Sequence, residues 1–356
     1  MLRAMEEKMT LKKMHLFLAA ELLLISLYAV MIPERPVQAA QKKTIFIMGD
    51  SKSRYYSDEE RPRDGWGQEL VHYLKGGKGS TAEFPKEYSG YSGVVRHRLQ
   101  NLNIENWGQS YASVKTFLDS GRFSGMLQQV NKNDYVIIAL GHNDARREYA
   151  SLGKYKKNLT YCIKMIQKKG AEVILVTTPP RNFTNAKKIR INAKDYYLAT
   201  RKIAKNFGLS CIDLNKKCVE YFNFRGKKIC NAWYIKYKPG QHAVYPNGID
   251  DSTHFNQKGA RILAKIVAVS IQNDSKQKFL SSQFSIHTKK LYKTYSKAKK
   301  YKKKNYTKRT WKKFIKERNK AWKVLYLSDG RMWEVLTARY FSAICLPDCT
   351  VMHVTA

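Results

Sequence analysis

Short apolar runs that alternate with helix-length segments constrain the fold of this chain more than any other feature. Three runs are continuously apolar and two are less so; they lie at Thr44–Met48, Asp134–Leu140, Glu172–Thr177, Leu209–Asp213 and Asn103–Asn106. Strands that are apolar along their whole length are buried on both faces, which is typical of a parallel sheet. We therefore expect these five segments to be strands of one sheet.

Four segments have the length and apolar pattern of helices. They are Trp66–Leu74, Leu152–Lys169, Asn192–Phe207 and Asn256–Ile271. In the last one Ile262, Ile266 and Val269 fall near one face. Strands that alternate with helices predict an α/β fold with helices on both faces of a parallel sheet. Ligand sites in such folds lie beyond the carboxyl ends of the strands.

Composition and charge narrow the class of protein. The chain is 43% hydrophobic and 26% charged, so it can bury a core and is not a disordered chain. Its mean hydropathy of −0.52 excludes a polytopic membrane protein. The formal net charge is +38, and residues 289–323 contribute 17 Lys or Arg against one acid. Such an excess favours a polyanionic partner, namely nucleic acid, anionic polysaccharide or an anionic cell surface.

The first forty residues predict a secretory signal peptide. Basic residues precede an apolar run at Leu16–Ile32, and small residues follow that suit cleavage after Ala39 or Ala40. An uncleaved anchor is the alternative, but the run is short for a membrane span and contains Glu21. We expect a secreted or cell-surface protein that touches the membrane only through this segment. Export argues against nucleic acid as the partner.

The six cysteines are Cys162, Cys211, Cys218, Cys230, Cys345 and Cys349. An even number in an exported chain permits disulfides, although the sequence does not define their pairing. No CxxC pair is present, and no Cys/His spacing indicates zinc. We expect small buried thiols, with one bridge among Cys211, Cys218 and Cys230 as the alternative.

Four polar blocks follow in chain order at the predicted ends of strands and helices. They are Gly49-Asp50-Ser51, Asn106-Trp107-Gly108-Gln109-Ser110, Gly141-His142-Asn143-Asp144 and Asp251-Ser252-Thr253-His254. Each short pattern by itself is frequent at average residue usage. Their joint occurrence in this order indicates one site assembled from four segments.

Acyl transfer is the chemistry that these blocks allow. A serine hydroxyl becomes nucleophilic when a base removes its proton, and Ser51 with His254 as the base fits that requirement. Asp251 lies three residues before His254 and is expected to orient the imidazole, with Asp250 as the less well spaced alternative. The oxyanion would bind to the backbone N–H groups of Ser51 and Gly108 and to the Asn143 side-chain amide.

In these blocks the chain resembles the SGNH (GDSL-type) hydrolases, named after a Ser, a Gly, an Asn and a His. Ser51, Gly108, Asn143 and His254 match those positions in order, and Asp251 stands at the usual place before the histidine. The resemblance implies a flavodoxin-like, three-layer α/β/α fold around a five-stranded parallel sheet. It also implies ester hydrolysis by these residues, without a metal or other cofactor.

Further motifs resemble the rhamnogalacturonan acetylesterase branch, and the resemblance covers residues 43–272. They are Gly65-Trp66-Gly67-Gln68, Thr178-Pro179-Pro180 and Tyr245-Pro246-Asn247-Gly248. This branch implies removal of O-acetyl groups from an acetylated pectic polysaccharide. Lys52 departs from the pattern, which usually has a small hydroxyl residue there, so the fine substrate preference stays open. The alternatives are another acyl ester, such as acetylated xylan or a lipid, and a non-catalytic carbohydrate-binding surface protein.

Each assignment has a purely structural alternative. Ser51 suits a helix N-cap, Asn143 suits a turn, and His254 suits a hydrogen-bonded structural position. We expect Trp66 and Trp107 to pack near the site rather than stack on sugars. Three nearby cations suit either of two roles, attraction of uronate carboxylates or a solvated surface charge, and are left out of the site. They are Lys52, Arg54 and Arg181.

The basic C-terminal region predicts a different organisation. We expect a signal peptide at 1–40, a hydrolase domain at 41–275, a flexible basic linker at 276–305 and a partial helical segment at 306–356. Phe314, Ala321 and Leu325 fall on or near one face of the predicted helix. The segment resembles the opening of a FIVAR-type module and departs from it after Leu325. The basic run is either a solvated spacer or a device that retains the protein on an anionic wall polymer.

Overall fold

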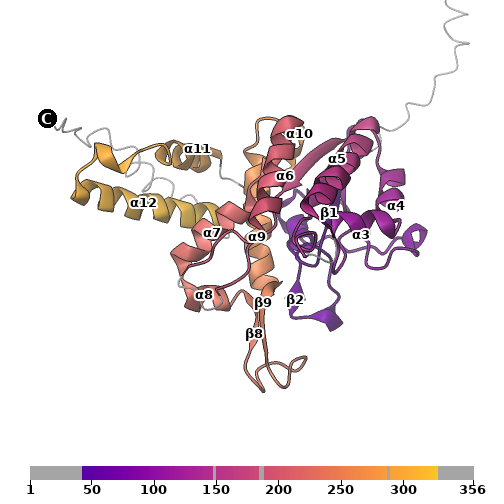
Figure 1. Cartoon of the computed structure of the whole chain (residues 1–356), viewed down its shortest axis with the longest axis horizontal. Helices are drawn as coiled ribbons and strands as arrows, with labels where there is room; N and C mark the ends of the chain where they lie inside the picture. The colour runs from indigo at the N-terminus through magenta and orange to yellow at the C-terminus, as the bar shows by residue number, and fades with distance from the viewer. Residues whose placement is uncertain (1–41, 147–149, 184–187, 287–288, 328–356) are drawn as a thin grey trace, which may run out of the picture. The chain divides into compact units, whose positions relative to one another are not determined.

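The computed structural model describes residues 42–146, 150–183, 188–286 and 289–327 (Figure 1). The chain divides into two units, residues 1–42 and 43–356. The signal peptide predicted for residues 1–40 therefore falls outside the described residues, and so do Cys345 and Cys349. Among the helices in the described ranges, none combines the length and apolar character that a membrane span requires.

Six strands form the central sheet. They are β1 (Lys43–Gly49), β3 (Val95–Arg98), β4 (Leu102–Asn106), β5 (Tyr135–Ala139), β6 (Glu172–Val176) and β7 (Ser210–Ile212). Their order is β3-β4-β1-β5-β6-β7, and β3 alone runs antiparallel to its neighbour. The five predicted strands are confirmed, but the five-stranded sheet is wrong by one strand. The polar sequence of β3 suits an edge position and carries no apolar run.

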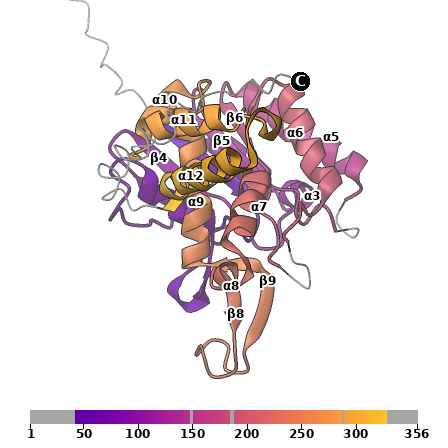
Figure 2. The ribbon, with the colours of Figure 1, turned by 90° about the vertical axis from the view of Figure 1, so that its left-hand side faces the viewer.

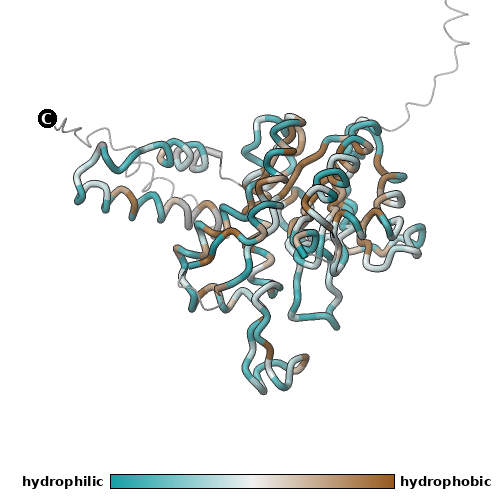
Figure 3. The backbone as a smooth tube through the Cα atoms, in the orientation of Figure 1, coloured by the Kyte–Doolittle hydropathy of each residue, from teal (hydrophilic) through white to brown (hydrophobic). Residues whose placement is uncertain are grey.

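Helices cover both faces of this sheet, which confirms the α/β/α layers. Along β1 the side chains alternate, with Ile45 and Ile47 in one core cluster and Phe46 and Met48 in the other. One face is covered by α2 (Trp66–Leu70), α7 (Leu214–Arg225) and α9 (Gln257–Gln272). The other face is covered by α3 (Val114–Asp119), α4 (Arg122–Gln129), α5 (Leu152–Lys168) and α6 (Lys194–Asn206). Figure 3 shows the hydrophobic residues concentrated along these inner strands and helices.

Two of the predicted helices, α5 and α9, begin where polar side chains cap them. Asn256 Oδ1 accepts the Gly259 N–H at 3.1 Å, and Ser151 Oγ accepts the Lys154 N–H at the start of α5. Such caps satisfy backbone donors that have no partner inside the helix. Only the predicted segment Trp66–Leu74 differs, because α2 gives way to a 3₁₀ turn over its second half.

A second, three-stranded antiparallel sheet is absent from the sequence prediction. It consists of β2 (Arg63–Asp64), β9 (Ile249–Asn256) and β8 (Tyr234–Tyr237), in the order β2-β9-β8, and α8 (Lys227–Asn231) precedes β8. The segment that contains His254 is therefore a strand that runs directly into α9. Its polar sequence hides it from an apolar pattern, since Phe255 is its one fully buried residue.

The C-terminal region corrects the linker prediction for residues 276–305. It contains α10 (Lys278–Gln283), α11 (Lys289–Ala298) and α12 (Lys308–Leu327), and α12 packs against α9 (Figure 2). Tyr295, Ala321 and Leu325 are buried in the same cluster as the α9 side chains. In α11 Tyr295 and Ala298 form a narrow buried stripe among lysines. A composition argument overlooks such a stripe because lysines outnumber the residues that pack.

The four described cysteines are free thiols. Cys162, Cys218 and Cys230 are buried and Cys211 is half-buried. The alternative of a bridge among Cys211, Cys218 and Cys230 is therefore not realised, and the expectation of buried thiols holds for Cys162, Cys218 and Cys230.

Candidate active site

Three of the four polar blocks meet at one edge of the central sheet. β1 pairs in parallel with β4 on one side and with β5 on the other, so that Ile47 faces Asn106 and Gly49 faces Ala139. The segments that follow these strands carry Ser51, Gly108 and Asn143. Because the carboxyl ends of parallel strands share one edge, the sheet gathers these residues as the sequence predicts.

The fourth block reaches the same edge through the second sheet. β9 pairs with β2 and brings His254 to Ser51, with 3.0 Å between Nε2 and Oγ across 203 positions of chain. His254 Nδ1 lies 2.6 Å from Asp251 Oδ2. Asp250, the alternative acid, instead pairs with Lys236. The structure thus joins Ser51, His254 and Asp251 in one hydrogen-bonded chain.

The surroundings of Asp251 keep its carboxylate ionised. Its Oδ1 accepts the backbone N–H groups of Thr253 at 2.7 Å and His254 at 3.1 Å. Burial acts to raise the pKa of Asp251, but the hydrogen bond and charge of His254, helped by these N–H groups, outweigh it and lower the pKa to about 2. An ionised Asp251 holds the Nδ1 proton in place and leaves Nε2 free to accept a proton from Ser51.

The predicted oxyanion donors differ in their availability. Asn143 is 6% exposed and uses one amide hydrogen on the Ala112 carbonyl at 2.9 Å, which leaves its second hydrogen for a ligand. The Ser51 backbone N–H has no acceptor within the described ranges. The Gly108 N–H, in contrast, already donates to Asn106 Oδ1 at 2.9 Å. Its role as an oxyanion donor therefore stays a prediction.

Sequence reasoning missed two side chains that hold the nucleophile segment. Asn106 donates from Nδ2 to the Ser53 carbonyl at 2.7 Å while its Oδ1 accepts Gly108. Tyr56 donates its hydroxyl to the Ser51 carbonyl at 2.8 Å. These bonds fix the segment after β1 to the segment after β4. Asn106 was visible as the first residue of the second block, but only the structure shows what it contacts.

Lys52 is buried and is not the surface charge that one interpretation assigned to it. It is 2% exposed, and its Nζ lies 2.9 Å from the buried Asp50 carboxylate. Burial lowers the pKa of Lys52, and the Asp50 charge opposes that shift. The charge of Lys52, followed by burial, lowers the pKa of His142 to about 3. His142 is therefore neutral near pH 7 and does not duplicate the role of His254.

An open pocket of about 620 Å³ exposes Ser51 and His254. Its wall holds Arg63, Arg146 and Arg181, and no Asp or Glu is among the described residues that line it. Arg63 and Arg181 form no ion pair with a described residue. Trp66 and Trp107 are 1% and 0% exposed, which confirms that they pack behind the site.

No group of three or more His, Cys, Asp or Glu side chains within the described ranges is arranged to hold a metal ion.

The chain matches the family model for GDSL-like lipases and acylhydrolases over residues 45–267, which includes every residue of the hydrogen-bonded chain. The chain belongs to this family. It is accordingly a carboxylic ester hydrolase.

Curated relatives of this GDSL hydrolase come from Bacillus subtilis (strain 168). Rhamnogalacturonan acetylesterase RhgT is 28% identical over 241 residues, which are 67% of this chain and 91% of RhgT. The probable rhamnogalacturonan acetylesterase YesY is 28% identical over 234 residues, which are 64% of this chain and 92% of YesY.

Among solved structures, the crystal structure of the protein YxiM from Bacillus subtilis has the same fold. It superposes with a TM-score of 0.51 at 23% identity, and the match covers 67% of this chain and 57% of YxiM. At this identity the likeness concerns the fold alone.

Proposed function

We propose that this GDSL hydrolase removes O-acetyl groups from an acidic, pectic polysaccharide. The observation that carries the proposal is the hydrogen-bonded chain from Ser51 through His254 to Asp251 in an arginine-lined pocket. Ser51 attacks the acetyl carbonyl while His254 Nε2 takes its proton, and the protonated imidazole then donates that proton to the leaving sugar oxygen. In the second half of the reaction, His254 takes a proton from water, which attacks the acetyl-enzyme. Acetate leaves and Ser51 recovers its proton from the imidazole.

The tetrahedral intermediates of this reaction carry a negatively charged oxygen. The Ser51 backbone N–H and the second amide hydrogen of Asn143 are the donors available to it. Removing one such donor typically costs about 3–4 kcal/mol of transition-state stabilisation. Asp50 and Lys52 stand directly before and after the nucleophile, and their buried ion pair links the two sides of that segment.

Two observations support an acidic polysaccharide as the substrate. The curated relatives RhgT and YesY are named as a rhamnogalacturonan acetylesterase and a probable one. In the pocket, Arg63 and Arg181 present guanidinium groups that have no carboxylate partner among the described residues. A guanidinium binds a carboxylate through paired, charge-assisted hydrogen bonds, and the uronate residues of pectin carry such a group.

We further propose that the enzyme acts outside the cell, either secreted or held at the surface. The support is the signal-like pattern of residues 1–40 and the basic C-terminal region. Attraction between this region and an anionic wall polymer or acidic pectin would be long-ranged at low salt and screened at high salt.

Acetate release from acetylated pectin, acetylated xylan and a triacylglycerol tests the proposal. We expect release from pectin to dominate, and Ser51→Ala to lower turnover by several orders of magnitude with an unchanged circular dichroism spectrum. Ser89→Ala, an exposed serine, is the matched control and should retain full activity. Retained activity in Ser51→Ala would disprove the nucleophile, and preference for xylan or lipid would replace the substrate.

A further inference from the structure

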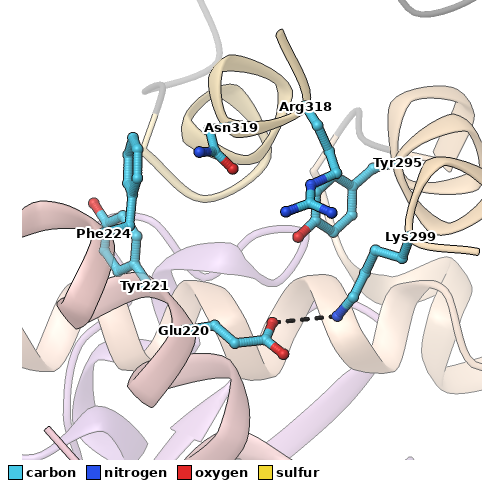
Figure 4. A pocket seen from close by; sticks show the side chains of 7 residues that line it. All are labelled: Glu220, Tyr221, Phe224, Tyr295, Lys299, Arg318 and Asn319. Carbon is cyan, nitrogen blue, oxygen red and sulfur yellow. Dashed lines mark hydrogen bonds and ion pairs between the residues drawn. The ribbon is translucent and has the colours of Figure 1, made fainter. Parts of the chain in front are cut away.

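A second pocket, of about 370 Å³, lies where the C-terminal helices meet the hydrolase domain (Figure 4). Its seven lining residues come from three helices and from the turn after one of them, and include no member of the hydrogen-bonded chain at Ser51. α7 contributes Glu220, Tyr221 and Phe224, α11 contributes Tyr295, the turn after α11 contributes Lys299, and α12 contributes Arg318 and Asn319. The volume falls in the range of small-ligand pockets, about 300–1,000 Å³.

Aromatic side chains form much of the wall of this pocket. Tyr221 and Tyr295 are almost fully buried, at 1% and 8% exposure, and the Tyr221 ring stacks on Trp233, so both lie behind the pocket surface. Phe224 is 42% exposed at the rim. Phe224 is thus the lining aromatic residue with substantial accessible surface for a ring-shaped ligand, because aromatic side chains supply large rigid contact surfaces.

Charged and polar groups complete the lining. Glu220 pairs with Lys299 at 3.2 Å, and Lys299 Nζ also lies 5.8 Å from the centre of the Tyr295 ring. Arg318 extends into the same space, and its Nε is buried without a hydrogen-bond partner among the described residues (Figure 4). A buried guanidinium nitrogen that lacks an acceptor carries a desolvation cost, which a bound anion would remove.

We propose that this pocket binds a uronate residue of an acidic polysaccharide. The sugar ring would lie against Phe224, and its carboxylate would accept hydrogen bonds from Arg318, with Asn319 in reach of a hydroxyl. The choice of a uronate among ring-bearing anions rests on the proposed function. The pocket would then hold the polymer at a point separate from the ester that is cleaved.

The exposed lysines near the pocket fit this role. Lys297, Lys299 and Lys300 follow each other along the end of α11 and its next turn, and all three are exposed. They attract a polyanion without selecting its shape, whereas Arg318, with its buried Nε, and Phe224 select one residue of the chain. Binding at this site therefore differs from general attraction to the basic surface.

Titration of the full chain with deacetylated oligogalacturonate tests the proposal without requiring catalysis. All variants carry Arg63→Gln and Arg181→Gln, so that the catalytic pocket lacks these two guanidinium groups. We expect Arg318→Gln to weaken binding about tenfold, as loss of a hydrogen bond to a charged group does. Arg309→Gln, an exposed arginine on the same helix, is the charge-matched control and should change binding less than twofold.

Phe224→Ala provides a second variant that does not endanger folding, because Phe224 is partly exposed; it should also weaken binding several-fold. The proposal would be overturned if Arg318→Gln bound as tightly as the protein that carries only Arg63→Gln and Arg181→Gln. An equal loss in Arg309→Gln, or equal binding of a neutral oligosaccharide of the same length, would overturn it too. If binding follows the expected pattern but acetylated pectin is not hydrolysed, the proposed substrate of the catalytic pocket fails and the pocket assignment stands.

Discussion

At the scale of single residues, Asp251 fixes the tautomer of His254 through the hydrogen bond to Nδ1. Asp251→Asn fits the same space but removes the charge that stabilises a protonated imidazole. We expect kcat to fall by about 10³–10⁴-fold, as the corresponding change does in serine proteases. The measurement is steady-state hydrolysis of an aryl acetate by the folded variant.

The neighbouring Asp250→Asn is the control for that experiment. Asp250 is exposed and pairs with Lys236, away from the imidazole. We expect its kcat to stay within about twofold of the wild type, since exposed ion pairs contribute little. If both variants lose activity equally, the role assigned to Asp251 is wrong.

Asp144 predicts how the stability of the enzyme depends on pH. Its Oδ1 accepts the Val114 N–H at 2.9 Å, its Oδ2 is buried without a partner among the described residues, and burial chiefly raises its pKa to about 7. The folded state thus holds this proton more tightly than the unfolded chain. The contribution to stability is complete below the ordinary carboxyl pKa near 4 and is lost as pH rises through about 7.

Asp144→Asn removes this titration and keeps an acceptor for the Val114 N–H. We expect the free energy of unfolding to fall less between pH 5 and pH 8 in this variant than in the wild type, measured by urea denaturation at both values. Asp195→Asn, at an exposed position at the start of α6, should leave the wild-type difference unchanged. A difference in Asp144→Asn equal to that of the wild type would contradict the assignment.

At the scale of elements, the segments after β1 and β4 are packed without space between them. A Cβ at Gly108 would lie 2.7 Å from Arg54 Cα, closer than real contacts allow. Gly108→Ala therefore has to push apart the segments that carry Ser51 and Asn106. We expect a loss of about 1–3 kcal/mol of stability and at least tenfold lower kcat, because overpacking shifts backbone that positions the nucleophile.

Gly153→Ala in α5 is the matched glycine control. An added Cβ there meets no atom closer than 4.0 Å, and alanine favours the helix by roughly 0.5–1 kcal/mol. We expect unchanged kcat and equal or higher thermal stability. Normal activity in Gly108→Ala would show that the contact between the two segments does not position the nucleophile.

Strand prediction succeeded for the elements that are buried on both faces. β1, β5 and β6 are apolar along their length, so hydrophobic burial alone identifies them. β3 and β9 were not predicted as strands because each has polar residues facing solvent or the site. Such strands exist through their pairing with a neighbour, and pairing is not a property of the local sequence.

At the scale of the whole molecule, the part of the basic C-terminal region that the structure describes, α10 to α12, packs on the hydrolase domain. Leu325 is 0% exposed and packs with α9 side chains. Leu325→Ala should lower the free energy of unfolding by about 2–5 kcal/mol, as truncation of a buried leucine does. A flexible tail, in contrast, would make the substitution neutral.

Leu198→Ala provides the comparison in a urea or thermal melt. Leu198 is 45% exposed on α6, so its truncation should change stability by at most about 0.5 kcal/mol. Equal effects of the two substitutions would mean that α12 does not pack on the hydrolase domain. The second pocket would then lack the side that α12 forms.

The sequence by itself determined the α/β class, the parallel strands and the residues of the four blocks, because apolar periodicity and short motifs are local properties of the chain. Only the tertiary structure decided that His254 sits on a strand paired with β2, that Asn106 occupies the Gly108 N–H, and that Lys52 is buried on Asp50. The same holds for the docking of α11 and α12. These outcomes depend on contacts between distant segments, where pairing, close packing and desolvation set the energy, and no local pattern records those contacts.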